Sequence, residues 1–240
     1  MRSLLWTGHP TTQFSEMSLK FGSGQITSGD NVYIDTTNIG HTESSPDTLC
    51  SVVYRNLTTE YIKPDWFRDR AVLAPTNAAV NTLNNDLLSQ LPSQERCYRS
   101  VDTPLQNSIR LHNFQQNLST SQHHPGFAPH ELHLKVGCPV ILLRSLNAST
   151  LCNGTRFIEA QIITGHGKND TVFIPKIPLT PIDCPYTIFA MTINKAQCQS
   201  LKVVALDLRT LCFSHGQFYV GCSRVGHPDN LFIFAPEEKN

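Results

Sequence analysis

The sequence predicts an α/β fold with a small β unit inserted into it, and three stretches of the 240-residue chain carry this prediction. A short apolar run at residues 71–75 is followed by a helical pattern, which indicates a strand, a turn and a helix. Short apolar runs interleaved with helical turns return after Pro185, as in a sheet that is buried on both faces. Between these two parts, residues 131–181 change to short alternating strands separated by Gly, Pro and Asn turns.

The segment before residue 70 gives few structural signals. Residues 1–20 have no clear periodicity, and the polar, turn-rich stretch that extends to Ser51 contains one candidate strand, at 32–34. The next element is better defined, because Thr76 or Asn77 can cap a helix directly after the strand at 71–75. The apolar face of that helix is expected to consist of Val80, Leu83, Leu87 and Leu91.

The remaining strands follow from periodicity and turn residues. In the inserted unit we expect strands at 132–136, 140–143, 157–163 and 172–174, a spacing that suggests a small barrel. After Pro185 we expect buried strands at 188–191, 203–208 and 231–234. The predicted organisation is an unassigned segment (1–20), the first part of the α/β domain with a preceding connector (21–130), the insert (131–181) and the second part of the domain (182–240).

Composition and charge restrict the classes of function. With 40% apolar and 16% charged residues, the chain is expected to fold into a globular protein rather than to remain disordered. Lysine plus arginine and aspartate plus glutamate each number 19, so a site for a polyanion must come from a local basic cluster. No apolar run approaches the roughly 20 residues that span a bilayer, and the apolar start of the chain is too short for a secretory signal.

The eight cysteines do not have the spacing of zinc ligands. No Cys-x-x-Cys pair is present and no histidines cluster with the cysteines, so we expect no metal site. Without a secretory signal, reduced thiols in an intracellular protein are the expected state.

The chemically most informative segment is residues 191–200, which follows an apolar run. Six of its side chains offer polar groups just past a strand: Thr192, Asn194, Lys195, Gln197, Gln199 and Ser200. Together with backbone N–H groups at a helix start, they are suited to contact phosphate or sugar. An ordinary solvated loop is the alternative, and composition by itself favours it because polar strand ends are common.

Arg224 presents a similar choice. It ends a helix-like run that begins near Ser214, and a guanidinium there can stabilise charge that develops on a nucleotide phosphate during phosphoryl transfer. The helix dipole alone also favours an arginine at a helix C-terminus. A hypothesis from another class is a cysteine hydrolase that uses Cys222 with His215, seven positions before it.

Four blocks of the sequence, in their order and rough spacing, resemble the C-terminal half of the Pif-type (petite integration frequency) DNA helicases. These are 5′-to-3′ motors of superfamily one, and they include the helicase modules of Helitron transposons. The blocks are residues 70–77 with 88–92, 129–143 with 151–156, 191–200, and 213–225. The similarity extends over roughly residues 21–236, and several independent motifs in register make it specific.

This resemblance implies that the α/β domain is the second RecA-like motor domain, of the P-loop NTPase type, and that the insert is a barrel similar to Src-homology-three (SH3) domains. The positions that match DNA contacts are Thr76, Asn77 and Thr192, and those that match the loop coupling DNA to nucleotide are Lys195, Gln197 and Gln199. Arg224 matches the catalytic arginine finger of the family. His130 and Lys135 are candidates for DNA-side or structural contacts.

The same resemblance implies ATP and Mg²⁺ as cofactors, single-stranded DNA as partner, and a nuclear or mitochondrial location. The ATP-binding loop G-x-x-x-x-G-K-[ST] is absent from this sequence, since residues 22–25 lack its lysine and no second carboxylate follows Asp35. We therefore expect Arg224 to act on ATP held by a missing or separate N-terminal RecA-like half, and the chain to be inactive by itself. The alternative is a non-catalytic single-strand-binding module or a relic of a transposon helicase.

Two departures from the family pattern affect the late motifs. Cys198 stands where the family has glycine, and its side chain is expected to hinder close approach of the backbone to phosphate. Gly221 and Cys222 stand where the family usually has alanine and leucine. Since glycine inside a helix costs roughly 1 kcal/mol relative to alanine, the last helix is expected to be looser.

Overall fold

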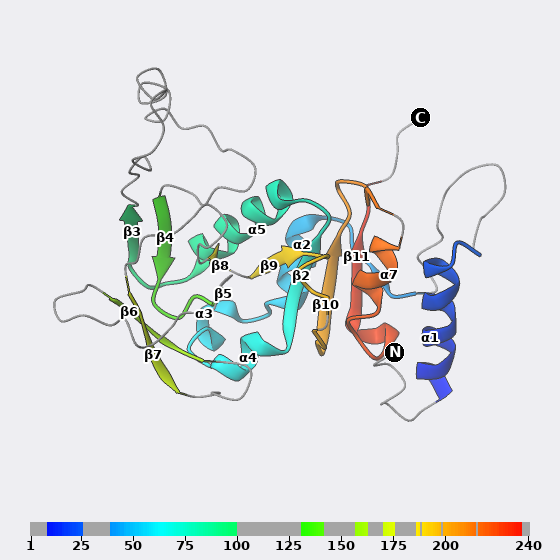
Figure 1. The fold of residues 1–240 in the computed structure, drawn as a ribbon, viewed down its shortest axis with the longest axis horizontal. Coiled ribbons are helices and arrows are strands. Elements are labelled where there is room, and N and C mark those ends of the chain that lie inside the picture. Colours follow the sequence, from blue (N-terminus) through cyan, green and yellow to red (C-terminus); the bar gives the residue numbers. More distant parts are fainter. Residues whose placement is uncertain are drawn as a thin grey trace, which may run out of the picture.

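The computed structural model describes residues 9–25, 39–99, 131–141, 157–162, 170–175, 186–187, 189–197, 199–214 and 216–236 (Figure 1). Its helices are α1 (His9–Gly22), α2 (Pro46–Val53), α3 (Leu57–Glu60), α4 (Pro64–Arg68), α5 (Asn77–Gln90) and α7 (Gln217–Cys222), with a 3-10 turn at Pro228–Asn230. Its strands are β1 (His41–Thr42), β2 (Arg70–Ala74), β3 (Glu95–Arg99), β4 (Glu131–Lys135), β5 (Val140–Ile141), β6 (Phe157–Gln161), β7 (Thr171–Pro175), β8 (Tyr186–Thr187), β9 (Ala190–Thr192), β10 (Val203–Asp207) and β11 (Leu231–Phe234). None of these described helices combines the length and apolar character that crossing a bilayer requires.

Five parallel strands form the central sheet, in the order β1-β11-β10-β2-β9. The runs predicted at 71–75, 203–208 and 231–234 correspond to β2, β10 and β11. The run predicted at 188–191 contributes β9, which begins two residues later, at Ala190. A parallel sheet connected through helices confirms the α/β prediction. The strand predicted at 32–34 lies outside the described residues.

Alternate residues of the strands supply two hydrophobic cores, one on each face of the sheet. Val72, Ala74 and Ala205 pack on one face with residues of α2 and α5. Ala71, Leu73, Val204 and Leu206 pack on the other face with residues of α1 and α7. Figure 1 shows α1 and α7 on the side of the sheet opposite α5. Burial on both faces explains why the strands read as continuous apolar runs.

The helix α5 forms as the sequence predicts. Thr76 is its N-cap, and the Thr76 hydroxyl accepts a hydrogen bond from the Ala79 amide at 3.4 Å. The four residues predicted to form its apolar face are all buried: Val80, Leu83, Leu87 and Leu91. Periodicity and capping therefore locate this element correctly.

The helix α2 begins inside the stretch predicted to be turn-rich, so that prediction is wrong from Pro46 onward. The Ser45 hydroxyl accepts from the Thr48 amide at 3.1 Å, and the Thr48 hydroxyl accepts from the Ser45 amide at 3.1 Å. This reciprocal capping box, with Pro46 in the first turn, starts the helix. Leu49 and Val53 are fully buried on its inner face.

The helix α1 occupies a region for which no element was predicted. Phe14 is buried, and Phe21 meets Phe218 of α7 edge to face with ring centroids 5.6 Å apart. Phe14, Met17 and Phe21 have helical spacing and join the same core. Three residues are a short signal, which is why the periodicity was not apparent in the sequence.

The inserted unit consists, among the described strands, of three antiparallel pairs: β3 with β4, β5 with β8, and β6 with β7. These pairs do not confirm the predicted barrel, since no described hydrogen-bond ladder joins one pair to the next. β3 and β8 lie before and after the predicted limits of 131–181. Strand pairing therefore extends the unit on both sides, and the charged sequence of β3 explains why it was missed.

Asn84 of α5 hydrogen-bonds the start of β9, the edge strand of the central sheet in the part of the chain that the structure describes. Its side-chain oxygen accepts from the amides of Phe189 and Ala190 at 2.9 and 2.7 Å, and its Nδ2 donates to the Ala190 carbonyl at 3.0 Å. Asn84 is buried together with these backbone groups. One side chain thus provides the contacts that a further strand would otherwise make.

We expect Asn84→Ala to lower the free energy of unfolding by about 2–4 kcal/mol, because each buried amide left without an acceptor costs about 1–3 kcal/mol. Urea unfolding of the purified chain measures this change. The matched control is Asn85→Ala, which alters the exposed next residue of α5 and should change stability by less than about 0.5 kcal/mol. Equal losses in the two variants would contradict this role of Asn84.

Candidate nucleic-acid interface

The ends of β2 and β9 bring the two predicted strand-end motifs to one edge of the sheet. Ala74 of β2 lies in register with Thr192 of β9, and the Ile193 amide donates to the Ala74 carbonyl at 3.0 Å. Thr76 follows two residues after Ala74, so it emerges at the same carboxyl edge as Thr192. Ligands of open α/β sheets bind at this edge.

Thr192 organises the loop that follows β9. It is 6% exposed, its hydroxyl accepts from the Lys195 amide at 3.4 Å, and its carbonyl accepts from the Lys195 and Ala196 amides at 2.9 and 3.2 Å. Lys195 and Gln197 are exposed, whereas Gln199 is half-buried. The loop is a hydrogen-bonded turn with polar side chains directed outward, and Cys198 lies outside the described residues.

Arg224 ties this loop to the end of α7. Its Nη1 donates to the carbonyls of Ala196 and Gln199 at 3.2 and 3.3 Å, and its Nε donates to the Val220 carbonyl at 2.8 Å. The Arg224 carbonyl in turn accepts from the Leu201 amide at 2.9 Å. The contact with Val220 is the helix C-terminal role considered above, and the loop contacts place the guanidinium beside the segment that Thr192 begins.

Gln217 is a buried polar residue of this region that the sequence did not indicate. It is 2% exposed, its side-chain oxygen accepts from the Phe213 amide at 3.2 Å, and its Nε2 lies 3.5 Å from the Pro75 carbonyl. It therefore joins α7 to the residue just before Thr76. A glutamine beside an otherwise apolar run was the available signal.

Lys135 is not brought to this edge. Its ammonium group donates to the carbonyls of Ser89 and Leu91 at 3.1 and 2.9 Å, at the C-terminal end of α5. A 14-residue helix is about 20 Å long, so Lys135 lies roughly that far from Thr76 along the helix axis. This position corresponds to the structural alternative for Lys135, and His130 lies outside the described residues.

The cysteine hydrolase hypothesis is wrong for Cys222. Its thiol is fully buried in the core between α7 and the sheet, and burial raises its pKa far above the usual range, with a smaller contribution from Cys212. A nucleophilic cysteine needs the thiolate and access to a substrate, and Cys222 has neither. His215 lies outside the described residues.

The last helix is shorter than predicted and closely packed. α7 begins at Gln217 rather than near Ser214, because Gly216 before it has the left-handed backbone conformation, with φ 78°. A Cβ atom at Gly221 would lie 2.8 Å from Cδ2 of the buried Leu206. The absence of a side chain at Gly221 therefore allows α7 to approach β10 closely. This packing differs from the looser helix that the sequence predicts.

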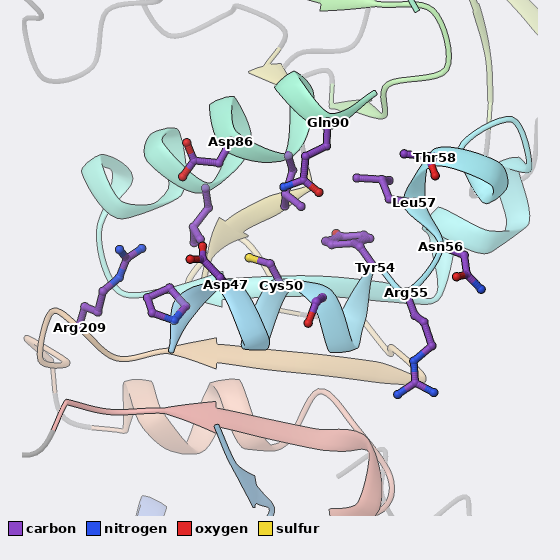
Figure 2. Close-up of a pocket in the computed structure, with 14 residues that line it drawn as sticks. Asp47, Cys50, Tyr54, Arg55, Asn56, Leu57, Thr58, Asp86, Gln90 and Arg209 are labelled. Carbon is purple, nitrogen blue, oxygen red and sulfur yellow. The ribbon is translucent and has the colours of Figure 1, made fainter. Parts of the chain in front are cut away.

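A separate cavity of about 610 Å³ opens between α2, α3 and α5 (Figure 2). Asp47, Asp86 and Arg209 lie toward one end, and Tyr54 lies farther along the cavity. Burial raises the pKa of the Cys50 thiol in its wall to about 12, and the carboxylates of Asp207 and Asp47 add to this effect. Cys50 is therefore protonated near neutral pH, and the cavity contains none of the residues predicted for nucleotide or DNA contact.

Arg224→Met keeps a long side chain but removes every donor to the loop. We expect the free energy of unfolding to fall by about 2–3 kcal/mol, in line with the loss of hydrogen bonds from a charged group. Hydrogen exchange at the amides of residues 193–201 should also become faster. The control is Arg55→Met, since Arg55 is exposed and likewise lies two residues after a short helix. Unchanged hydrogen exchange of the loop amides in Arg224→Met would contradict the proposed role of Arg224 in holding the loop.

Comparison with known proteins adds family information to this geometry. Residues 117–162 match the family model "DNA helicase Pif1, 2B domain". The chain is 31% identical over 131 residues to the ATP-dependent DNA helicase PIF1 of Saccharomyces cerevisiae and 23% identical over 203 residues to the ATP-dependent DNA helicase Pif1 of Campylobacter jejuni. These alignments cover 53% and 72% of this chain but only 14% and 43% of the two relatives.

A solved structure has the same fold. The Pif1 helicase of Candida albicans superimposes with a TM-score of 0.52 at 20% sequence identity, covering 94% of this chain and 53% of that one. The parallel sheet and this likeness fit an α/β, RecA-like helicase fold. The chain spans less than half the length of the two relatives found by sequence. Together these findings show that the chain is similar to part of the Pif1-type helicases.

Proposed function

We propose that this chain is the second RecA-like portion of an ATP-dependent 5′-to-3′ DNA helicase and that its carboxyl sheet edge contacts single-stranded DNA. One observation carries the proposal: the loop that begins at Thr192, at the edge where Thr76 also emerges, is hydrogen-bonded farther along to Arg224, through the carbonyls of Ala196 and Gln199. A residue proposed to act on nucleotide and residues proposed to contact DNA thus share one connected segment. The relatives named as ATP-dependent DNA helicases support this assignment.

The DNA contacts in this proposal are made to the phosphate backbone. Asn77 is exposed at the first turn of α5, where backbone N–H groups and the helix dipole favour an anion. Lys195 and Gln197 project from the neighbouring loop. Because the chain has no net charge, binding depends on this local group rather than on a general attraction to DNA.

Arg224 provides the coupling between DNA and nucleotide. A phosphate that binds its guanidinium competes with the carbonyls of Ala196 and Gln199 for the same donors. Exchange of these partners would alter the loop that carries Lys195. ATP and Mg²⁺ are held, in this proposal, by another RecA-like unit, because the G-x-x-x-x-G-K-[ST] loop is not in this sequence.

Lys195→Ala should weaken binding of a fluorescent oligothymidine and make its salt dependence shallower. Loss of one phosphate contact to a single strand lowers the slope of log K against log salt by about 0.7. Fluorescence anisotropy at several salt concentrations measures both quantities.

Lys202→Ala is the matched control for this experiment. Lys202 is also exposed, but it lies before β10 at the opposite edge of the sheet and pairs with Asp69 at 2.6 Å. Its removal should leave the slope unchanged. Equal slopes for wild type and Lys195→Ala would contradict a phosphate contact by Lys195.

The purified chain alone should not hydrolyse ATP at a rate that single-stranded DNA increases, because one arginine cannot position ATP and Mg²⁺. A phosphate-release assay with and without oligothymidine tests this expectation. DNA-stimulated hydrolysis that disappears in Arg224→Ala would contradict the proposal that another RecA-like unit holds the ATP. The DNA contact is tested separately, by Lys195→Ala.

A further inference from the structure

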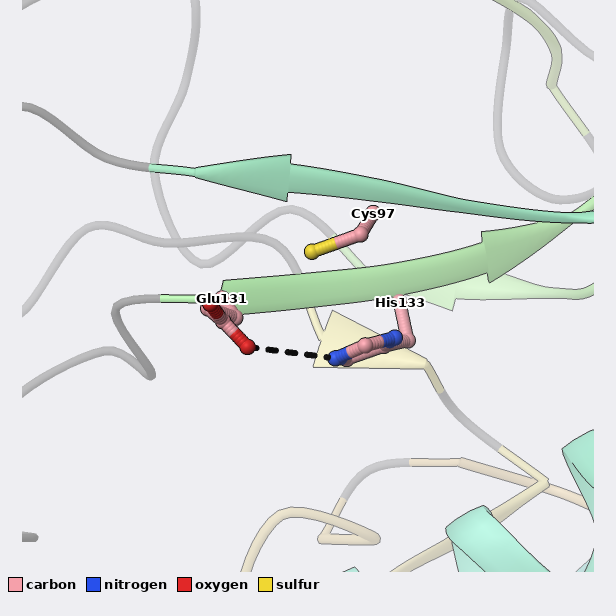
Figure 3. Close-up of side chains that lie close together, drawn as sticks. All are labelled: Cys97, Glu131 and His133. Carbon is pink, nitrogen blue, oxygen red and sulfur yellow. Dashed lines mark ion pairs between the residues drawn. The ribbon is translucent and has the colours of Figure 1, made fainter. Parts of the chain in front are cut away.

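Cys97, Glu131 and His133 form a cluster on the antiparallel pair β3–β4 (Figure 3). In Figure 1 this pair lies apart from β2 and β9, whose ends form the sheet edge proposed to contact DNA. Cys97 lies directly opposite His133 in the antiparallel register, and Glu131 lies two residues before His133 on the same face. One potential ligand atom from each residue lies within 4.8 Å of the other two. All three residues are exposed, so an ion has access from solvent.

Glu95 orients the imidazole of His133. The Nδ1 atom of His133 lies 2.7 Å from Oε1 of Glu95, and since a carboxylate can only accept, Nδ1 carries the hydrogen. In the neutral ring the lone pair is then on Nε2, the nitrogen that faces Glu131. A carboxylate on the other ring nitrogen is the usual arrangement behind a metal-binding histidine.

Arg99 orients the carboxylate of Glu131 in a comparable way. Arg99 Nε donates to Oε1 of Glu131 at 2.9 Å, while the other oxygen, Oε2, lies 3.8 Å from Nε2 of His133. A separation of 3.8 Å is too long for a hydrogen bond. Two ligands of a tetrahedral zinc ion with bonds near 2.0 Å are separated by about 3.3 Å, so a small movement of exposed side chains closes the site.

We propose that Cys97 Sγ, His133 Nε2 and Glu131 Oε2 bind a divalent zinc-type metal ion. Thiolate, imidazole and carboxylate are the three ligand types that zinc takes in proteins. Glu95 and Arg99 are positioning residues, and the fourth coordination position is open to water. The ion cross-links β3 to β4, whose sequences are more than 30 residues apart, at the start of the inserted unit.

The test is cobalt and zinc binding by the chelator-treated full chain. Co²⁺ should produce the charge-transfer absorption of a thiolate ligand with a stoichiometry of one, and competing Zn²⁺ should abolish it. Cys97→Ser should remove this absorption, and His133→Ala should weaken Zn²⁺ binding, measured by calorimetry, at least about tenfold. Glu95→Ala should weaken it by about tenfold, as is typical for loss of a residue that orients a ligand.

Cys212→Ser is the matched control, because Cys212 is another described thiol that lies outside the cluster. It should leave the Co²⁺ absorption and Zn²⁺ affinity unchanged, and circular dichroism should show that every variant is folded. Thiolate absorption that persists in Cys97→Ser, or equal Zn²⁺ affinity in wild type and His133→Ala, would overturn the proposed site. Absence of any Zn²⁺ binding would also overturn it, leaving the cluster as a set of surface ion pairs.

Discussion

The position of β9 is the constraint on which the candidate interface depends, and Asn84 maintains it. Among the described strands, β9 has a neighbour on one side only, so its outward backbone groups require other partners within a buried environment. Asn84 satisfies two amides and one carbonyl there. Because Thr192 ends β9, the side chain that completes the edge strand also fixes where the loop of Lys195 begins.

Arg224 extends this constraint from the sheet to the last helix. Its guanidinium donates hydrogen bonds to the Ala196 and Gln199 carbonyls of the loop and to the Val220 carbonyl of α7. Arg224 therefore connects the loop to the helix. Hydrogen bonds from a charged donor are stronger than those between neutral groups, and a phosphate is a strong competitor for the same guanidinium donors. An anion bound at Arg224 would therefore compete with the contacts that order the loop.

Periodicity located the elements that are buried on a complete face, such as β10, β11 and α5 with its cap at Thr76. It failed at α1, where the apolar stripe is only Phe14, Met17 and Phe21. It also missed α2, because the capping box there has Thr48 in place of the Glu or Gln of the usual sequence motif. The strand-end residues Thr76 and Thr192 could be predicted to share an edge, because parallel strands end together. Partners such as Asn84 with Ala190, and Gln217 with Pro75, require tertiary packing and have no local signal.

The proposed metal site has no signal in the local sequence for a related reason. Zinc motifs are recognised from cysteines and histidines close in sequence, whereas strand pairing brings Cys97 opposite His133 from a distant segment. The pair β3–β4 is also fixed to α5, since Lys135 donates to carbonyls at its C-terminal end. α5 carries Thr76 at its other end, so one rigid helix connects the inserted unit with the sheet edge. An ion that orders β3–β4 would consequently stabilise α5, the helix that contains Asn77 and Asn84, without contacting DNA itself.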